Sequence, residues 1–146
     1  MLTINIICTG KIKENYLKDA INEYLKRLSK YTKLEVIELK DSNINDEEEL
    51  ILKHINNNDF VVTLEIEGKM LSSKELSKKL EEWFINSYNI VFVVGGSCGL
   101  SENVKKRSNY KISFSKLTFP HQLFRVILLE QIYRSFKIIN NETYHK

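Results

Sequence analysis

Short apolar runs rich in β-branched residues alternate with amphipathic helical patterns along the whole chain, and this alternation restricts the fold most. Such runs are typical of buried strands, and apolar positions three to four residues apart are typical of helices packed on one side. Strands separated by helices predict an α/β fold with a mainly parallel sheet and helices on both faces. The predicted strands are residues 2–8, 34–39, 60–66, 90–94 and 110–114, and the predicted helices are 16–28, 48–56, 72–84, 101–107 and 120–138.

Local signals predict where several of these elements lie and end. Residues 90–94 form the most apolar run and therefore belong in the middle of the sheet. Gly68 is expected to end the strand of residues 60–66. Ser72 with Glu75 forms a capping-box pattern at the start of the helix of residues 72–84. Residues 41–49 hold five acids and no base, which indicates a loop. Pro120 suits the first turn of the last helix, because a proline there loses no hydrogen bond.

Length and composition favour one domain spanning residues 1–146, with a substantial core. A net charge of +3 permits a polyanionic partner but is equally explained by solubility. The two cysteines lack zinc spacing, so neither a metal site nor a disulfide framework is expected, and a reducing cytoplasm is the default location. The N-terminal apolar run lacks the features of a signal peptide, and no apolar stretch approaches the ~20 residues of a membrane span.

Two loops that follow predicted strands hold the candidate ligand-binding residues. Residues 94–100 are rich in glycine, and residues 114–123 lead through Pro120 into the last helix. Loops at strand ends form small-molecule pockets in α/β proteins, and glycine lets a ligand approach backbone N–H groups. A tight turn without a ligand explains the glycines equally well. They do not form the G-x-G-x-x-G pattern of dinucleotide sites, and Cys98 is interpreted as a packing residue because no histidine lies near it in the sequence.

The last helix is apolar over more than one stripe, so it must be covered on two sides. Leaving one such side in water would cost several kcal/mol at ~25 cal/mol per Å² of apolar area. Either a second subunit covers the outer side in a homodimer, or the helix is buried within the monomer.

Several further polar residues have both functional and ordinary explanations. His121, just inside a helix start, can be a base or a ligand donor, or can make only a structural hydrogen bond. The tail of residues 140–146 is either frayed or folds over a site when substrate arrives.

Basic residues can form a surface that contacts phosphates, although a solvated helix face is the commoner explanation. Two of them, Arg125 and Arg134, are on the last helix. The others belong to the first helix and its flanks: Lys11, Lys13, Lys18, Lys26, Arg27, Lys30 and Lys33.

A series of ordered motifs runs along most of the chain. The motifs are residues 63–69 (TLEIEGK), 94–100 (VGGSCGL), 117–126 (LTFPHQLFRV), 130–134 (EQIYR) and 144–146 (YHK). Together they closely resemble the RlmH family, small SPOUT-class methyltransferases that methylate N3 of a pseudouridine in 23S ribosomal RNA. The resemblance covers essentially the whole chain, and several motifs at matching spacing are far more specific than one glycine loop.

The resemblance implies a SPOUT fold with a C-terminal trefoil knot, which physical reasoning from the sequence would not propose because knots are almost absent from proteins. It also implies S-adenosylmethionine as cofactor, a homodimer, and 23S rRNA within the assembled ribosome as partner, with no metal and no membrane. The family's cofactor contacts fall on Leu64, Gly95 and the run Phe114, Ser115, Lys116, Leu117, Thr118 and Phe119. Gly96 is added because it adjoins these residues and gives access to the backbone.

Methylation of N3 requires alignment of the methyl group with the nitrogen and removal of the N3 proton. We expect Tyr144 and His145 to position or deprotonate the base and Arg134 to hold a phosphate, with His121 as a weaker candidate for the base. The residues expected to contact rRNA phosphates are Lys11, Lys13, Lys26, Arg27 and Lys30.

Two other functions remain compatible with parts of the sequence. A non-catalytic ribosome- or RNA-binding module would keep the same fold without turnover, and methyl transfer would exclude it. A Rossmann-like nucleotide enzyme is disfavoured, because the glycine fingerprint and a suitably placed acidic ribose-binding residue are both missing.

Overall fold

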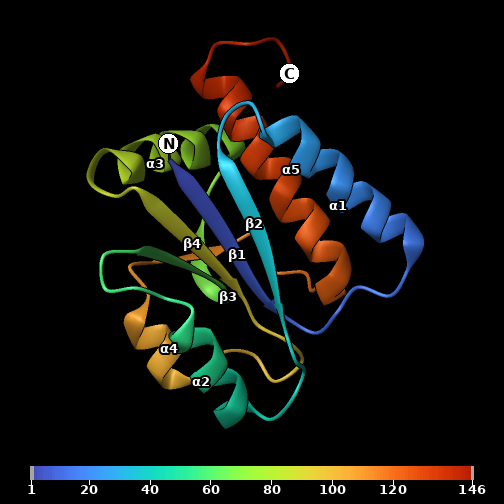
Figure 1. Ribbon diagram of the computed structural model, residues 1–146. Coiled ribbons are helices and arrows are strands. Elements are labelled where there is room, and N and C mark those ends of the chain that lie inside the picture. The colour runs from blue at the N-terminus through green and yellow to red at the C-terminus, as the bar shows by residue number, and fades with distance from the viewer. Residues whose placement is uncertain (1, 146) are drawn as a thin grey trace.

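A computed structural model describes residues 2–145, so Met1 and Lys146, the last residue of the Tyr-His-Lys motif, lie outside the described residues. Five parallel strands form one sheet in the order β2-β1-β4-β3-β5 (Figure 1). The strands are β1 (Thr3–Thr9), β2 (Lys33–Leu39), β3 (Phe60–Met70), β4 (Asn89–Val94) and β5 (Tyr110–Ser113). The predicted parallel sheet is confirmed, and the most apolar strand, β4, lies at its centre as expected.

Helices cover both faces of the sheet, as predicted (Figure 1). Alternate strand residues point to opposite layers, so Ile6 and Phe92 pack in the larger core and Ile7 and Val93 in the smaller one. The larger core lies under α1 (Asn15–Leu28), α3 (Ser73–Asn86) and α5 (His121–Ile139), and the smaller core lies under α2 (Ile44–Lys53) and α4 (Glu102–Arg107).

No helix within residues 2–145 is long and apolar enough to cross a membrane.

The helix starts follow the local signals closely. The capping box predicted for α3 is present: the Ser72 hydroxyl accepts from the Glu75 N–H, and the Glu75 carboxylate accepts from the Ser72 N–H. Pro120 lies one residue earlier than expected, as the N-cap of α5 rather than within its first turn. The trefoil knot stays a prediction.

The prediction that Gly68 ends β3 is wrong. The strand continues to Met70, but Leu64 and Lys69 both lie opposite Ile112, so residues 65–68 bulge out of the pairing with β5. A Cβ at Gly68 would lie 2.6 Å from the carbonyl carbon of Ile112. Glycine is therefore required here for the close approach of two backbones, and the bulge turns its side chains away from the regular pleat.

The acidic stretch is also not the predicted loop, because α2 begins at Ile44 and includes most of it. Asn43 caps the helix by accepting from the Asp46 N–H at 2.9 Å. Acidic side chains in a first helical turn interact favourably with the positive end of the helix dipole, which explains why several acids stabilise this helix start. Glu47 is 2% exposed, and its carboxylate accepts from the Ser42 N–H.

Glu47 should make the stability of the protein depend on pH. Burial raises the pKa of the Glu47 carboxyl, and Asp41 adds to the rise, while the Ser42 N–H partly offsets it. The folded protein therefore keeps a proton that the unfolded chain loses, so this contribution to stability is present at low pH and is lost as pH rises through the raised pKa. Replacing Glu47 by Gln should remove that loss, so the stability of the variant relative to wild type should grow from pH 4 towards pH 8.

Urea denaturation across this pH range measures the difference directly. The matched control is Glu49→Gln, an exposed position on the same helix. A constant difference between wild type and Glu47→Gln at all pH values would contradict the assigned pKa direction.

Candidate functional site

A cavity of about 390 Å³ lies at the carboxyl edge of the sheet. Its walls come from five segments: the β3 bulge, the glycine loop after β4, helix α4 through Lys105, the loop after β5, and the first turn of α5. Parallel strands bring their carboxyl ends to a single edge, which is where α/β proteins bind ligands. The two loops singled out in the sequence thus form one site.

The predicted cofactor residues gather around this cavity with one exception. Lys116 is not among the lining residues, although both of its neighbours are. Cofactor contact by these residues stays a prediction, but a single cavity now accounts for their dispersed positions. The lining members are Leu64, Gly95, Gly96, Phe114, Ser115, Leu117, Thr118 and Phe119.

The glycine loop is a tight turn and also a cavity wall, so the two explanations offered for it are compatible. The Gly99 N–H donates to the Gly96 carbonyl at 3.0 Å. A Cβ at Gly96 would collide with the Thr9 hydroxyl, so the loop can pack on β1 only with glycine there. The expectation that Cys98 packs in the interior is wrong, since this thiol is exposed at the tip of the turn. Cys8 is buried, and burial raises the pKa of its thiol to about 11, so it is not a thiolate nucleophile.

Sequence reasoning missed two carboxylates that line the cavity, Glu65 and Glu67. Both belong to the β3 bulge, whereas the sequence predicted an uninterrupted strand over residues 60–66. The opposite wall is aromatic: Phe124 of α5 contacts Phe114 edge-to-face at 5.1 Å between ring centroids and stacks on Phe119 at 6.1 Å. Lys105 of α4 lines the cavity as well, so the cavity combines an apolar wall, backbone at the glycines, and charged groups of both signs, with two carboxylates and one ammonium. Among residues 2–145, no three His, Cys, Asp or Glu side chains converge on a possible metal position.

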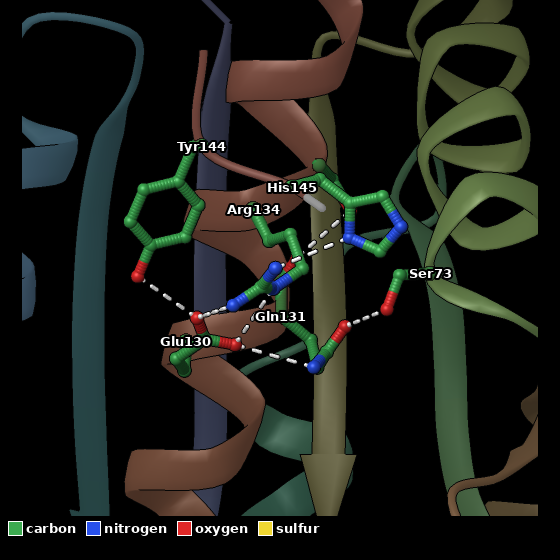
Figure 2. A network of polar contacts seen from close by, with 7 residues as sticks. Ser73, Glu130, Gln131, Arg134, Tyr144 and His145 are labelled. Atoms are coloured by element: carbon green, nitrogen blue, oxygen red, sulfur yellow. Dashed lines mark hydrogen bonds and ion pairs between the residues drawn. The ribbon is translucent and has the colours of Figure 1, made fainter.

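The three predicted catalytic residues are brought together by the chain's fold-back after α5. Asn141 adopts the left-handed conformation (φ 54°), which reverses the chain, and Tyr31 donates to the Glu142 carboxylate at 2.5 Å. The tail then lies along α5 with Tyr144 and His145 on either side of Arg134 (Figure 2).

Glu130 organises this cluster and was not predicted as a site residue. Its carboxylate accepts from Arg134 at 2.9 Å and from the Tyr144 hydroxyl at 3.0 Å (Figure 2). The Arg134 guanidinium lies 4.7 Å from the centroid of the Tyr144 ring and contacts His145 Nδ1 at 3.1 Å. A guanidinium only donates, so Nδ1 accepts and is unprotonated in this arrangement. The i, i+4 spacing of Glu130 and Arg134 was the sequence signal for the pair.

The tail cluster does not reach the cavity of its own chain. The α5 residues that line the cavity are His121 and Phe124, whereas Arg134 follows ten residues later on the same helix. A helix rises 1.5 Å per residue, which puts about 15 Å between Phe124 and Arg134 along the axis. His121, the weaker candidate for the base, is thus the only one of the four candidate catalytic residues that lines the cavity in one chain.

The basic residues expected to contact rRNA divide between the two ends of the molecule. Lys11 and Lys13 are exposed in the loop after β1, and the Lys11 carbonyl accepts from Gln122 near the start of α5. Arg27 and Lys30 lie at the other end of α1, where Arg27 pairs with Glu23 and Lys30 lies 3.8 Å from Glu142 of the tail. Lys26 is exposed beside them. Their contact with phosphates stays a prediction. The expectation that Arg125 belongs to such a surface is wrong, because its side chain is buried and hydrogen-bonded within the core.

Comparison with known proteins gives one family over almost the whole chain. A family model described as "Predicted SPOUT methyltransferase" matches residues 2–145. A protein of Methanococcus vannielii is 57% identical, and a protein of Clostridium botulinum (strain Alaska E43), named "Ribosomal RNA large subunit methyltransferase H", is 53% identical. Each alignment covers 99% of this chain and 100% of the relative.

A solved structure shares the fold at low sequence identity. It is titled "The structure of a probable methylase family protein from Haemophilus influenzae Rd KW20". The match has a TM-score of 0.58 at 10% identity and covers 98% of this chain and 70% of the other. At this identity the similarity supports the fold alone.

The tail cluster gives a testable pKa effect. Burial raises the pKa of the Tyr144 phenol, and the hydrogen bond to the Glu130 carboxylate and its negative charge raise it further. Replacing Glu130 by Gln should therefore lower the Tyr144 pKa part of the way towards the ordinary value of about 10, because burial remains. NMR titration of ring-labelled tyrosine, with Tyr144→Phe for assignment, measures the change. Glu23→Gln is the control, and an unchanged Tyr144 pKa in Glu130→Gln would show that Glu130 does not hold the tail.

Proposed function

The chain belongs to the SPOUT methyltransferase family, and from that premise we propose that it methylates N3 of a pseudouridine in 23S rRNA. The methyl donor is S-adenosylmethionine, and the substrate is the assembled ribosome, so the protein acts in the cytoplasm. The observation that carries the proposal is 53% identity, over the full length, to a relative named for methylation of large-subunit rRNA.

The cavity suits S-adenosylmethionine in size and chemistry. Ligand pockets of about 300–1,000 Å³ with mostly apolar walls are typical for molecules of this class, and this cavity holds about 390 Å³. Glu65 and Glu67 favour a ligand that carries positive charge, and the Phe124 wall suits a flat ring. The hydroxyls of Ser115 and Thr118 can hydrogen-bond to ribose or amino-acid groups. When bound there, S-adenosylmethionine supplies a methyl group activated by a positively charged sulfur.

The chain's own residues must then align the base and remove the N3 proton. His145 can accept a proton only at Nδ1 in the present arrangement, and Arg134 occupies that nitrogen. Binding of an rRNA phosphate by Arg134 would release Nδ1, so that His145 becomes a base only when substrate is present. Tyr144 would keep its hydroxyl protonated in this setting, as a hydrogen-bond donor to the base, because its pKa is raised.

A homodimer would bring the tail and the cavity together. About 15 Å of α5 separates the cavity from Arg134 within one chain, whereas in a two-fold dimer each tail can approach the cavity of the other subunit. Leu123 on α5 and Leu117 in the cavity wall are 40% and 74% exposed, which fits an apolar surface that a second copy covers.

Transfer of labelled methyl from S-adenosylmethionine tests the activity. The substrates are intact ribosomes that lack the modification and, in parallel, free 23S rRNA. We expect label at N3 of one pseudouridine on the ribosome and little label on free RNA. Absence of label on both, with folded protein that binds the cofactor, would favour the non-catalytic ribosome-binding module instead.

Mixing two inactive variants tests the shared site. His145→Ala removes the proposed base, and Glu67→Lys replaces an anion in the wall of the cavity by a cation, which should repel a cationic cofactor. Glu67 is exposed in the β3 bulge and is not among the apolar residues proposed for the dimer surface, so this change should leave the fold and the dimer intact. Equal amounts of both, unfolded and refolded together, should recover roughly a quarter of wild-type activity, since half of the dimers are mixed and each mixed dimer has one intact site. Activity no higher than that of the separate variants would place tail and cavity in the same chain.

A further inference from the structure

Arg125 is a charged residue buried in the core beside the cavity. It is 1% exposed and is the largest of the fully buried side chains among residues 2–145. Its guanidinium donates to the Glu38 carboxylate at 2.8 Å and to the carbonyls of Thr9 and Gly10 at 2.7 and 2.8 Å. The same Glu38 carboxylate accepts from the Ile12 N–H at 2.9 Å. One side chain of α5 is thus hydrogen-bonded to the ends of β1 and β2, and through Glu38 it is connected to the loop that leads to α1.

These contacts connect two walls of the cavity. On one side, Thr9 packs directly against Gly96 of the glycine loop, where a Cβ would collide with its hydroxyl. On the other side, Arg125 follows Phe124, whose ring lines the cavity and packs on Phe114 and Phe119. Arg125 itself does not line the cavity. It is hydrogen-bonded to Thr9, which packs on the glycine wall, and it is the sequence neighbour of Phe124 in the aromatic wall.

Stability alone does not account for a charge at this position. A buried guanidinium rarely improves stability over an apolar side chain of similar size, because the buried charge loses its hydration, and here the paired Glu38 side chain stays 33% exposed. The surroundings are also unusually polar for a core. Five buried side-chain polar atoms lack a hydrogen-bond partner in the described part of the chain, and four of them belong to Arg125, Thr9, Glu47 and Ser42. Glu47 also lies close to Gly96, and its carboxylate accepts a hydrogen bond from the Ser42 N–H.

We propose that Arg125 is a positioning residue that holds the glycine loop at a fixed distance from the start of α5 and thereby shapes the cavity for its ligand. Carbonyl groups and a carboxylate at the ends of two strands can be held together only by a donor with several N–H groups in a fixed plane. An apolar side chain would fill the same volume but would leave Thr9, and with it the glycine loop, free to shift. The identity of the ligand as S-adenosylmethionine rests on the proposed function.

Three variants separate positioning from general stability. Arg125→Met keeps the volume and removes all donors, whereas Arg125→Lys keeps the charge but cannot reach all three acceptors. Leu28→Ala is the matched control, because Leu28 is fully buried at the far end of α1 and its truncation destabilises the core without touching the cavity. Unfolding midpoints establish that each variant is folded and how far it is destabilised.

Three measurements are made on each folded variant. Hydrogen exchange of the amides of residues 95–100 reports on the glycine loop without any ligand. The Kd for S-adenosylmethionine reports on the cavity, and the single-turnover rate at saturating cofactor reports on the reacting groups. We expect Arg125→Met to speed loop exchange and to raise the Kd about 10- to 100-fold, with the saturated rate nearly unchanged, and Arg125→Lys to lie between it and wild type.

The results distinguish this inference from the proposed function. The inference is overturned if Arg125→Met leaves loop exchange and Kd at wild-type values. It is also overturned if Leu28→Ala, at equal destabilisation, changes loop exchange and Kd as much as Arg125→Met does. Should Arg125→Met not fold, Arg125→Lys and Glu38→Gln carry the same comparison, since Glu38→Gln removes the counter-charge but keeps the hydrogen-bond acceptor. If wild type binds no S-adenosylmethionine, the proposed function fails, and loop exchange still decides the role of Arg125.

Discussion

The parallel direction of all five strands is the constraint on which the candidate site depends. Each strand must be followed by a crossover, and every crossover begins at the same edge of the sheet, so residues of β3, β4 and β5 that are far apart in sequence meet there. The apolar centre of β4 holds this edge in place, because residues 90–93 are fully buried between two helical layers. The loops at the edge are then free to carry polar and glycine residues.

The length of α5 gives the molecule two functional regions instead of one. Its first turn belongs to the cavity and its last turns hold Arg134 and the returning tail. A rigid helix cannot bring its ends together, so the chemistry expected of this chain requires either a second copy or a large movement of the tail. Glu130 and Glu142 hold the tail in an ordered position along α5, which favours the second copy.

Several features of the site were beyond sequence reasoning because they depend on contacts between distant segments. The strand predicted over residues 60–66 is present, but the bulge that brings Glu65 and Glu67 to the cavity depends on how closely β5 approaches Gly68. The acids of residues 41–49 suggested a loop, although the cap at Asn43 and the helix dipole make them a good helix start. Cys98 was expected to be a packing residue because no histidine lies near it in the sequence, whereas the turn between Gly96 and Gly99 places it in solvent.

The sequence by itself determined the order and type of the elements, the parallel sheet with β4 at its centre, the capping box of Ser72 and Glu75, and the family, because these depend on local periodicity and on motifs contiguous in the chain. It also indicated eight of the residues that line the cavity. Only the tertiary structure decided that Arg125 is a buried connection between two cavity walls and that Arg134, Tyr144 and His145 lie away from the cavity of their own chain. The physical reason is that burial, pairing of charges and distance along a rigid helix follow from the packing of segments more than a hundred residues apart, which no local pattern encodes.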